Sequence, residues 1–341
     1  MVEEVMKLLT SLVSLAAAAG ALAPPSGQIP LTGQAPKPLT REAIPLLGFG
    51  TWNLDRTNAS EAVSFAIQSG FRHIDCAAAY GNEELVGKGI ADGLAKTGLS
   101  REELWITSKL WNDHHGAKNV HTAIATSLQK LGLDYLDLYH MHWPVSSKSK
   151  KNHVGYKSTW AAMTKLLKTG QVKHLGVCNF SPYQLDDLIN STSHLPSVHQ
   201  MELHPYLQQT EWIDWHSKHG IHVTAYSPFA GANPTYDPGE PPQLLRNEVT
   251  QRIAKKRHCT PAQVLLVWGI SRGTSVIPKS SHANRIAENV GALTCKLEKG
   301  DLKEIDGLGN WHHRFVNPSK SWGVDLYEGL EDSKGKHEKS A

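Results

Sequence analysis

The sequence predicts an α/β protein folded as a (β/α)8 TIM barrel in a single domain. Eight short apolar segments run along the chain, and each is followed by a segment with the apolar periodicity of a helix. Eight such units over about 250 residues favour a closed barrel over an open sheet. The first strand leads into Gly48-Phe49-Gly50-Thr51-Trp52, so the G-x-G-x-x-G turn typical of an open dinucleotide-binding sheet is absent.

The strand segments are apolar throughout, which suits parallel strands covered on both faces. We expect strands at 44–51, 71–75, 104–109, 135–141, 172–177, 197–201, 222–225 and 275–277. We expect helices at 59–68, 83–96, 117–131, 156–168, 182–189, 208–218, 247–257, 261–269 and 283–291. Ser181-Pro182 and Thr260-Pro261 each place a hydroxyl cap before a first-turn proline, which is typical of a helix start.

Composition divides the chain into an N-terminal extension (1–37), the barrel (38–330) and a polar tail (331–341). The extension holds an apolar run at 8–22 and then a proline-rich stretch typical of a linker. Lys7 before the run and Ala21-Leu22-Ala23 at its end resemble a secretory signal, whereas Glu3, Glu4 and Pro24 do not fit one. We expect a cytoplasmic protein, with the secretory pathway as the alternative.

The bulk composition is that of a soluble globular protein, with 40% hydrophobic and 20% charged residues. The formal net charge of +3 is too small to suggest a nucleic-acid partner, and Lys148, Lys150 and Lys151 are interpreted as a short solvated loop. The run at 8–22 is too short for a confident membrane span. We expect a monomer that binds a small molecule.

The four cysteines are widely spaced and match no zinc pattern. We expect all four to be reduced thiols, which fits a reducing compartment. The cysteines are Cys76, Cys178, Cys259 and Cys295.

Four polar residues stand at or just after the carboxyl ends of consecutive predicted strands, where barrels hold their catalytic groups. They are Asp75, Tyr80, Lys109 and His142. An ammonium beside a phenol favours the phenolate and should lower its pKa. A carboxylate keeps that ammonium in place, and a histidine can hydrogen-bond a substrate oxygen. The set therefore fits the reduction of a ketone or aldehyde, with Tyr80 as the proton donor.

Each of these residues also has a structural interpretation. Tyr80 alone could be a half-buried tyrosine, His142 a hydrogen-bonded loop residue, and Asp75 and Lys109 a structural ion pair across neighbouring strands. The placement of all four at strand ends favours the catalytic interpretation.

The motifs around these residues resemble those of the aldo-keto reductase family. The resemblance is carried by Asp75-Cys76-Ala77-Ala78-Ala79-Tyr80-Gly81-Asn82-Glu83, Ser108-Lys109-Leu110-Trp111, His142-Trp143-Pro144 and Gly50-Thr51-Trp52. These motifs occur in the family's order, and the similarity extends from about Pro38 to about Tyr327. The resemblance implies an enzyme that uses NADPH/NADP+ to reduce aldehydes or ketones reversibly, close to aldehyde and glycerol-type reductases, such as those of fungi.

The resemblance also implies the cofactor contacts. Asn179 and Gln200 match positions that bind the carboxamide, and Tyr226 matches the aromatic residue that stacks on the nicotinamide. The remaining cofactor residues implied are Gly50, Thr51, Trp52, Asp75, Ser227, Phe229, Lys279, Ser280, Arg285, Glu288 and Asn289. A lysine, a hydroxyl and a planar arginine suit a 2′-phosphate, so NADPH is favoured over NADH. Cys178 stands where many relatives have serine, and we leave it out of the site.

The substrate pocket is expected beside the catalytic motifs, walled by Trp52, Trp111, His142 and Trp143. The C-terminal segment 311–327 resembles the family's substrate loop. Its polar residues, His312, His313, Arg314 and Asn317, suggest a polar rim that favours small hydroxy-aldehydes or acidic aldehydes over steroids and large aromatics.

Two alternatives from other classes are open. The chain could be a non-catalytic barrel that binds NADP(H) as a sensor or regulatory subunit, although the intact set of four residues opposes this. The nineteen histidines could also suggest a metal-dependent hydrolase. The pair His140-x-His142 has the spacing of metal ligands but stands at the fourth strand instead of the first, so we expect no metal.

Overall fold

The computed structural model describes residues 44–146, 155–232 and 241–330. The predicted extension at 1–37, the lysine loop at 148–151 and the polar tail at 331–341 lie outside these residues.

Eight parallel strands pair in chain order in one sheet. Leu47 bridges to Val276, and the N–H of Gly48 donates to the carbonyl of Val276 at 2.8 Å, so the last strand meets the first and the barrel closes. The predicted fold is confirmed. The strands are β1 (Phe49–Gly50), β2 (His73–Asp75), β3 (Trp105–Leu110), β4 (Leu136–Met141), β5 (Val172–Cys178), β6 (Val198–Glu202), β7 (His222–Tyr226) and β8 (Ser275–Val276).

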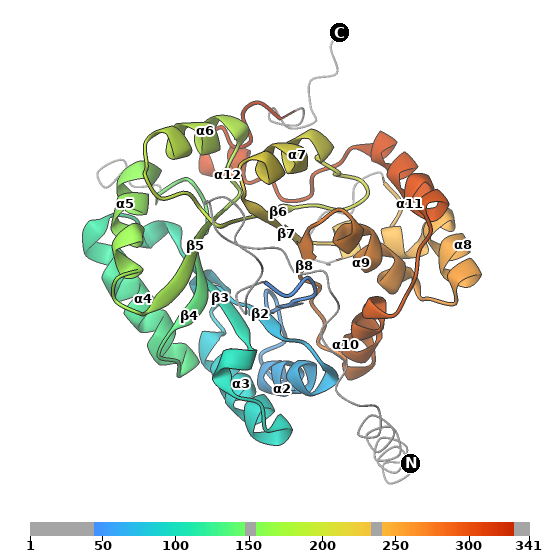
Figure 1. Cartoon of the computed structure of the whole chain (residues 1–341), viewed down its shortest axis with the longest axis horizontal. Coiled ribbons are helices and arrows are strands. Elements are labelled where there is room, and N and C mark those ends of the chain that lie inside the picture. The colour runs from blue at the N-terminus through green and yellow to red at the C-terminus, as the bar shows by residue number, and fades with distance from the viewer. Residues whose placement is uncertain (1–43, 147–154, 233–240, 331–341) are drawn as a thin grey trace.

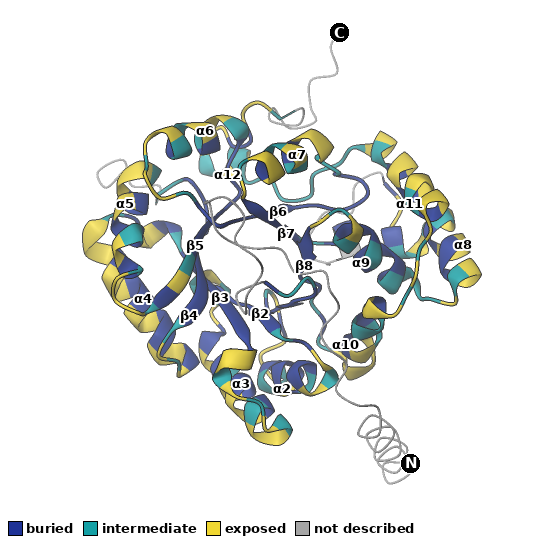
Figure 2. Ribbon diagram, in the orientation of Figure 1, coloured by how far each residue is buried: buried dark blue, intermediate teal, exposed yellow. Residues whose placement is uncertain are grey.

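Helices surround the strands, as Figure 1 shows, and turn their buried sides inward (Figure 2). The apolar spacing of each helix explains this, because residues three and four apart share one face. The helices are α2 (Ala59–Ser69), α3 (Glu83–Thr97), α4 (Ala117–Leu131), α5 (Tyr156–Leu166), α6 (Pro182–Asn190), α7 (Thr210–Lys218), α8 (Glu248–Arg257), α9 (Pro261–Ser271), α10 (Ala283–Val290), α11 (Lys299–Asp306) and α12 (Ser319–Trp322).

The largest differences from the predicted elements concern the first strand and the helices that follow the last βα unit. The first strand was expected over 44–51, but only Phe49–Gly50 form a regular ladder with β2. The preceding residues instead bond to the last strand, since the carbonyl of Leu46 accepts from the N–H of Val276 at 2.8 Å. Helices α11 and α12 were not predicted. They follow the last βα unit, where the alternation that identifies barrel elements has ended.

Several of the many histidines lie inside the barrel and not around a metal. His73 and His222 are buried and hydrogen-bond Thr107 and Ser275 at 3.2 and 3.0 Å. Burial lowers the pKa of His73 to about 4 and that of His222 to about 3, so both rings are neutral near pH 7. Within the described ranges, no cluster of three or more histidine, cysteine or acidic residues has the arrangement of a metal site.

His140 is also buried, and its ring fills the space that a Cβ atom on Gly176 would occupy, at 2.4 Å. A side chain at position 176 of the neighbouring strand β5 would therefore collide with this ring. His142 lies two positions further along the chain and lines the cavity described below. The two histidines of this pair therefore have different surroundings, His140 against the neighbouring strand and His142 at the cavity.

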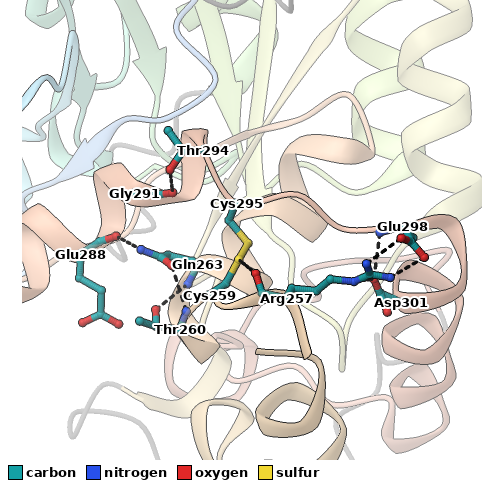
Figure 3. Close-up of a disulfide and its surroundings, with 10 residues drawn as sticks. All are labelled: Arg257, Cys259, Thr260, Gln263, Glu288, Gly291, Thr294, Cys295, Glu298 and Asp301. Atoms are coloured by element: carbon teal, nitrogen blue, oxygen red, sulfur yellow. Dashed lines mark hydrogen bonds and ion pairs between the residues drawn. A yellow bond between two sulfur atoms is a disulfide. The ribbon is translucent and has the colours of Figure 1, made fainter. Parts of the chain in front are cut away.

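The expectation of four reduced thiols is wrong for two of them. Cys259 and Cys295 form a disulfide with a Cα–Cα distance of 5.9 Å (Figure 3). Cys76 and Cys178 are free and buried. Thirty-six positions separate the two residues, so no local spacing signals their pairing. The disulfide links the segment just before α9 to the loop that follows α10.

We expect the double substitution Cys259→Ser/Cys295→Ser to lower the free energy of unfolding by about 2–4 kcal/mol, because the crosslink restricts the unfolded chain. Thermal or denaturant unfolding of both proteins measures this. As the control, a dithiol reductant should destabilise the wild type and leave the double variant unchanged. Thiol titration of denatured wild type should find two free thiols per chain, and four would contradict the disulfide.

Candidate functional site

The four polar residues predicted at strand ends meet at one end of the barrel. Asp75 ends β2, Lys109 lies next to the end of β3, and His142 directly follows β4. Tyr80 ends a short 3-10 helix at Ala78–Tyr80 that follows β2. Parallel strands bring their carboxyl ends to the same rim, so residues far apart in the sequence converge there.

Lys109 is the centre of this group. Its side chain is fully buried, and its ammonium donates to Asp75 Oδ2 at 2.6 Å, to the carbonyl of Cys76 at 2.8 Å and to the hydroxyl oxygen of Tyr80 at 2.9 Å. An ammonium has three N–H bonds, and each has an acceptor here. The position of the Tyr80 hydroxyl is therefore fixed by a buried, saturated cation.

Asp75 is held from its other side by Gln200. The amide nitrogen of Gln200 donates to Asp75 Oδ1 at 2.7 Å, so the two carboxylate oxygens bind different partners. The backbone carbonyl of Asp75 accepts from the hydroxyl of Thr51 at 2.8 Å. Gln200 was expected to contact a carboxamide. It lines the cavity, but its amide nitrogen also anchors the carboxylate.

Lys109 lowers the pKa of Tyr80, as expected, but it is not the largest influence on that pKa, and the net shift is upward. Burial raises the pKa of the Tyr80 phenol, and the positive charge of Lys109 opposes this effect without cancelling it. Burial also lowers the pKa of Lys109, but the charges of Asp75 and Tyr80 more than reverse this and raise it. The phenol and the ammonium thus both keep their protons at neutral pH.

His142 carries no charge at neutral pH. Burial lowers its pKa well below the usual value, and the nearby charge of Lys109 acts in the same direction. Its ring lies edge-on to the rings of Tyr80 and Trp111, with centroids 5.8 and 5.2 Å away. A neutral imidazole still has one N–H to donate, so His142 can hydrogen-bond a neutral oxygen without adding a charge.

Asn179 and Tyr226 form a second hydrogen-bonded group beside His142. The amide nitrogen of Asn179 donates to the backbone carbonyl of His142 at 3.0 Å, and its oxygen accepts from the hydroxyl of Tyr226 at 2.8 Å. Asn179 has a φ of 61°, a left-handed conformation that asparagine tolerates better than most residues. One N–H of its amide is left for a further partner.

A cavity of about 1220 Å³ opens above these residues. Most predicted site residues line it: Gly50, Trp52, Asp75, Tyr80, Trp111, His142, Trp143, Asn179, Gln200, Tyr226, Ser227, Phe229, Lys279, Ser280, Arg285, Glu288 and Asn289. Thr51 and Lys109 do not line it. Thr51 is fully buried and its carbonyl accepts from the amide of Asn82 at 2.9 Å, so it supports the rim from behind. Lys109 acts through Tyr80.

The part of the cavity beside α10 is lined by two cations and by the acidic Glu288. Lys279 and Arg285 both line it, and the pKa of Lys279 is lowered by burial and by the like charge of Arg285. An anion between two cations would relieve their repulsion. Ser280 and His282 also line this end, directly before the first residue of α10, where backbone N–H groups favour an anion.

Several lining residues were not identified from the sequence. Gln243, Leu245 and Arg246 come from the long connection after β7, and Pro261 and Ala262 from the first turn of α9. Phe315, Val316, Pro318 and Trp322 come from the C-terminal segment. The resemblance of that segment to a substrate loop could have indicated these residues. The expectation for the segment rested on its polar residues instead.

The expected polar rim is largely wrong. Of the four polar residues proposed for it, only Asn317 lines the cavity. The guanidinium of Arg314 lies over the ring of Tyr327, 4.0 Å from its centroid, and donates to Gln209. The walls near Tyr80 are aromatic instead. Trp322 packs edge-on against Trp111 and Trp143, with ring centroids 6.2 and 4.9 Å away.

Because burial raises the pKa of Tyr80, we expect its phenolate to be absent up to pH 10 in the enzyme without ligands. The measurement is an ultraviolet difference titration of the wild type against Tyr80→Phe from pH 7 to pH 10. The two curves should coincide over that range. A tyrosine that ionises below pH 10 in the wild type and is missing in the variant would contradict the expectation.

No helix among the described residues is long and apolar enough to cross a membrane.

Comparison with known proteins finds relatives that are similar over most of the chain. An uncharacterized oxidoreductase of Schizosaccharomyces pombe is 43% identical over 306 residues, which cover 85% of this chain and 92% of the yeast protein. The aldo-keto reductase family 1 member A1 of Bos taurus is 40% identical over 82% of this chain and 90% of its own length. A solved structure, a Bombyx mori aldo-keto reductase in complex with NADP, superimposes with a TM-score of 0.78 at 34% identity, covering 84% of this chain and 95% of that one.

The family assignment follows from the agreement of sequence and geometry. The model described as the aldo/keto reductase family matches residues 46–310, from the first strand through the last helix packed on the barrel. The resemblance seen in the separate motifs is thus confirmed over most of the chain, and the protein belongs to the aldo/keto reductase family.

Proposed function

We propose that this enzyme reduces aldehydes and ketones reversibly to alcohols with NADPH, and that Tyr80 donates the proton. One observation carries the proposal. The hydroxyl of Tyr80 lines the cavity while a fully buried ammonium holds it at 2.9 Å. A protonated acid at a fixed point of an aromatic pocket is what protonation of a carbonyl oxygen requires.

The cavity fits an extended dinucleotide. At one end, the free amide N–H of Asn179 and the ring of Tyr226 would hold a carboxamide-bearing ring. At the other end, Lys279, Ser280 and Arg285 would hold a phosphate. The 2′-phosphate of NADPH would supply the anion that separates the two cations. When bound, NADPH supplies a hydride to the carbonyl carbon.

The residues of this chain then act on the carbonyl oxygen. His142, neutral, donates a hydrogen bond that orients the oxygen toward Tyr80. Tyr80 transfers its phenolic proton to that oxygen as negative charge develops there. Lys109 stabilises the phenolate that remains, and Asp75 keeps the ammonium in place. Reprotonation of Tyr80 from solvent completes the turnover.

For the substrate, we propose neutral aldehydes that carry a ring, ahead of the small hydroxylated or acidic aldehydes expected from the sequence. Trp111, Trp143 and Trp322 form an apolar wall beside His142, and Arg314, the cation expected to bind an acidic group, is engaged with Tyr327 and Gln209. The complete set of four polar residues supports an enzyme and not a sensor subunit.

We propose a monomer without a nucleic-acid partner. For its location we keep the cytoplasm, with the secretory pathway as the alternative. The Cys259–Cys295 disulfide supports the alternative, because disulfides persist mainly in oxidising compartments. Sequencing the N-terminus of the protein from its natural source separates the two. Loss of the apolar run at 8–22 from the mature chain would replace the cytoplasmic proposal.

We expect Tyr80→Phe to lower kcat/KM for aldehyde reduction by about 10²–10⁴-fold, because the general acid is lost. NADPH affinity, followed by quenching of tryptophan fluorescence, should change little. Tyr183→Phe is the matched control, since the Tyr183 side chain is 62% exposed and lies away from the cavity. Full turnover in Tyr80→Phe would disprove the assignment of the acid.

We expect Lys279→Met to weaken NADPH binding by about 10–100-fold, because one hydrogen bond between charged groups is lost. NADH lacks the 2′-phosphate and should lose little affinity. Titration of both cofactors checks this, with Lys118→Met on the exposed face of α4 as the control. An equal loss for both cofactors would place the phosphate elsewhere.

A further inference from the structure

Glu202 is a buried carboxylate that the reaction described above does not use. It is the last residue of β6 and is 0% exposed. It lies two positions after Gln200, so both side chains point to the same side of the strand. A charged group in such a place needs partners, and those partners identify what it does.

The partners are a histidine and two backbone amides of the C-terminal segment. Glu202 Oε1 accepts from His204 Nε2 at 2.9 Å and from the N–H of Phe315 at 2.8 Å. Glu202 Oε2 accepts from the N–H of Val316 at 2.9 Å. Burial alone raises the pKa of Glu202, but the hydrogen bond from His204 and the charge of Arg314 bring it below the usual value. The carboxylate is therefore ionised at neutral pH.

The same stretch of chain is held from its other side. The backbone carbonyl of Val316 accepts from the hydroxyl of Tyr327 at 3.0 Å, so both backbone polar groups of this residue are fixed. The ring of Phe315 lies against Gly231, where a Cβ atom would come within 2.5 Å of it. His204 also packs edge-on against this ring, with centroids 5.5 Å apart.

This stretch forms one wall of the cavity. Phe315 and Val316 line it, and so do Asn317, Pro318 and Trp322 further along. Trp322 contacts Trp111 and Trp143, which flank His142. Glu202 itself does not line the cavity, so it acts on a substrate only through the position of this wall.

We propose that Glu202 is a positioning residue for substrate selection: its carboxylate fixes the backbone of Phe315 and Val316 and thereby sets the wall that a ring-bearing carbonyl substrate contacts. The inference rests on the proposed reductase function. The inference assigns the chemical step and the selection of substrates to different residues of the site. Tyr80 and Lys109 serve every carbonyl alike, whereas Glu202 serves only substrates large enough to reach the wall.

The test is Glu202→Gln, which preserves size but replaces one of the two acceptor oxygens with an amide N–H₂, so that one of the two backbone N–H donors loses its acceptor. With NADPH saturating, kcat/KM is measured for a neutral aromatic aldehyde and for glyceraldehyde. We expect the aromatic substrate to lose about 10–100-fold, mostly through KM, as expected for a displaced contact. Glyceraldehyde should lose less than threefold. The ratio of the two values does not depend on the fraction of enzyme that is active.

The matched control is Asp137→Asn. Asp137 is also a buried carboxylate that accepts from a backbone N–H, that of Ile106 at 2.9 Å, and it lies at the start of β4, away from the cavity. This variant should keep the wild-type ratio even if it is less stable. An unchanged ratio in a folded Glu202→Gln would overturn the inference. Wild type that reduces neither aldehyde would instead refute the proposed function.

A second measurement keeps the inference testable if the variant does not fold. Hydrogen exchange of the wild type should show the amides of Phe315 and Val316 as strongly protected, because both donate to a buried anion. Exchange of these two amides as fast as that of the exposed Lys320 in the short helix α12 would overturn the inference.

Discussion

The buried ion pair between Lys109 and Asp75 is the constraint on which the rest of the site depends. Two charges taken out of water are costly unless every donor and acceptor is satisfied. Lys109 meets this condition with three acceptors, one of which is Tyr80, and Asp75 meets it through Lys109 and Gln200. One of the hydrogen bonds that satisfy the ion pair is thus the same bond that fixes the Tyr80 hydroxyl. Removal of either charge would leave the other buried without compensation.

The fold, and the convergence of the four polar residues, could be predicted from the sequence because both have local signatures. Strand and helix periodicities are short-range patterns, and Asp75, Lys109 and His142 stand at strand ends that parallel topology must bring together. What the sequence could not give depends on three-dimensional surroundings. The net pKa shift of Tyr80 follows from burial outweighing the charge of Lys109, and the disulfide joins residues whose proximity no spacing reveals.

In the C-terminal segment, the sequence identified the right stretch of chain but not most of the residues that line the cavity. Its polar residues suggested a rim, yet the residues that line the cavity are mainly its apolar ones. Arg314 is directed away by Tyr327 and Gln209, and the backbone of the next two residues is held by Glu202. Composition gives the chemistry of a segment but not which of its faces meets the cavity. That choice is made by anchors such as Glu202 and Gln209, which lie more than a hundred positions earlier in the chain.

The histidines buried inside the barrel make the stability of the fold depend on pH. Their folded-state pKa lies below that of an unfolded histidine, so unfolded chains bind protons that the folded barrel excludes. Stability from these residues is complete above about pH 6.5 and is lost as the pH falls toward 4, by up to about 1.4 kcal/mol per histidine and pH unit. Mild acid therefore destabilises the folded barrel through these buried rings. A loss of activity on acidification would then come from the fold and not from Tyr80, whose phenol stays protonated.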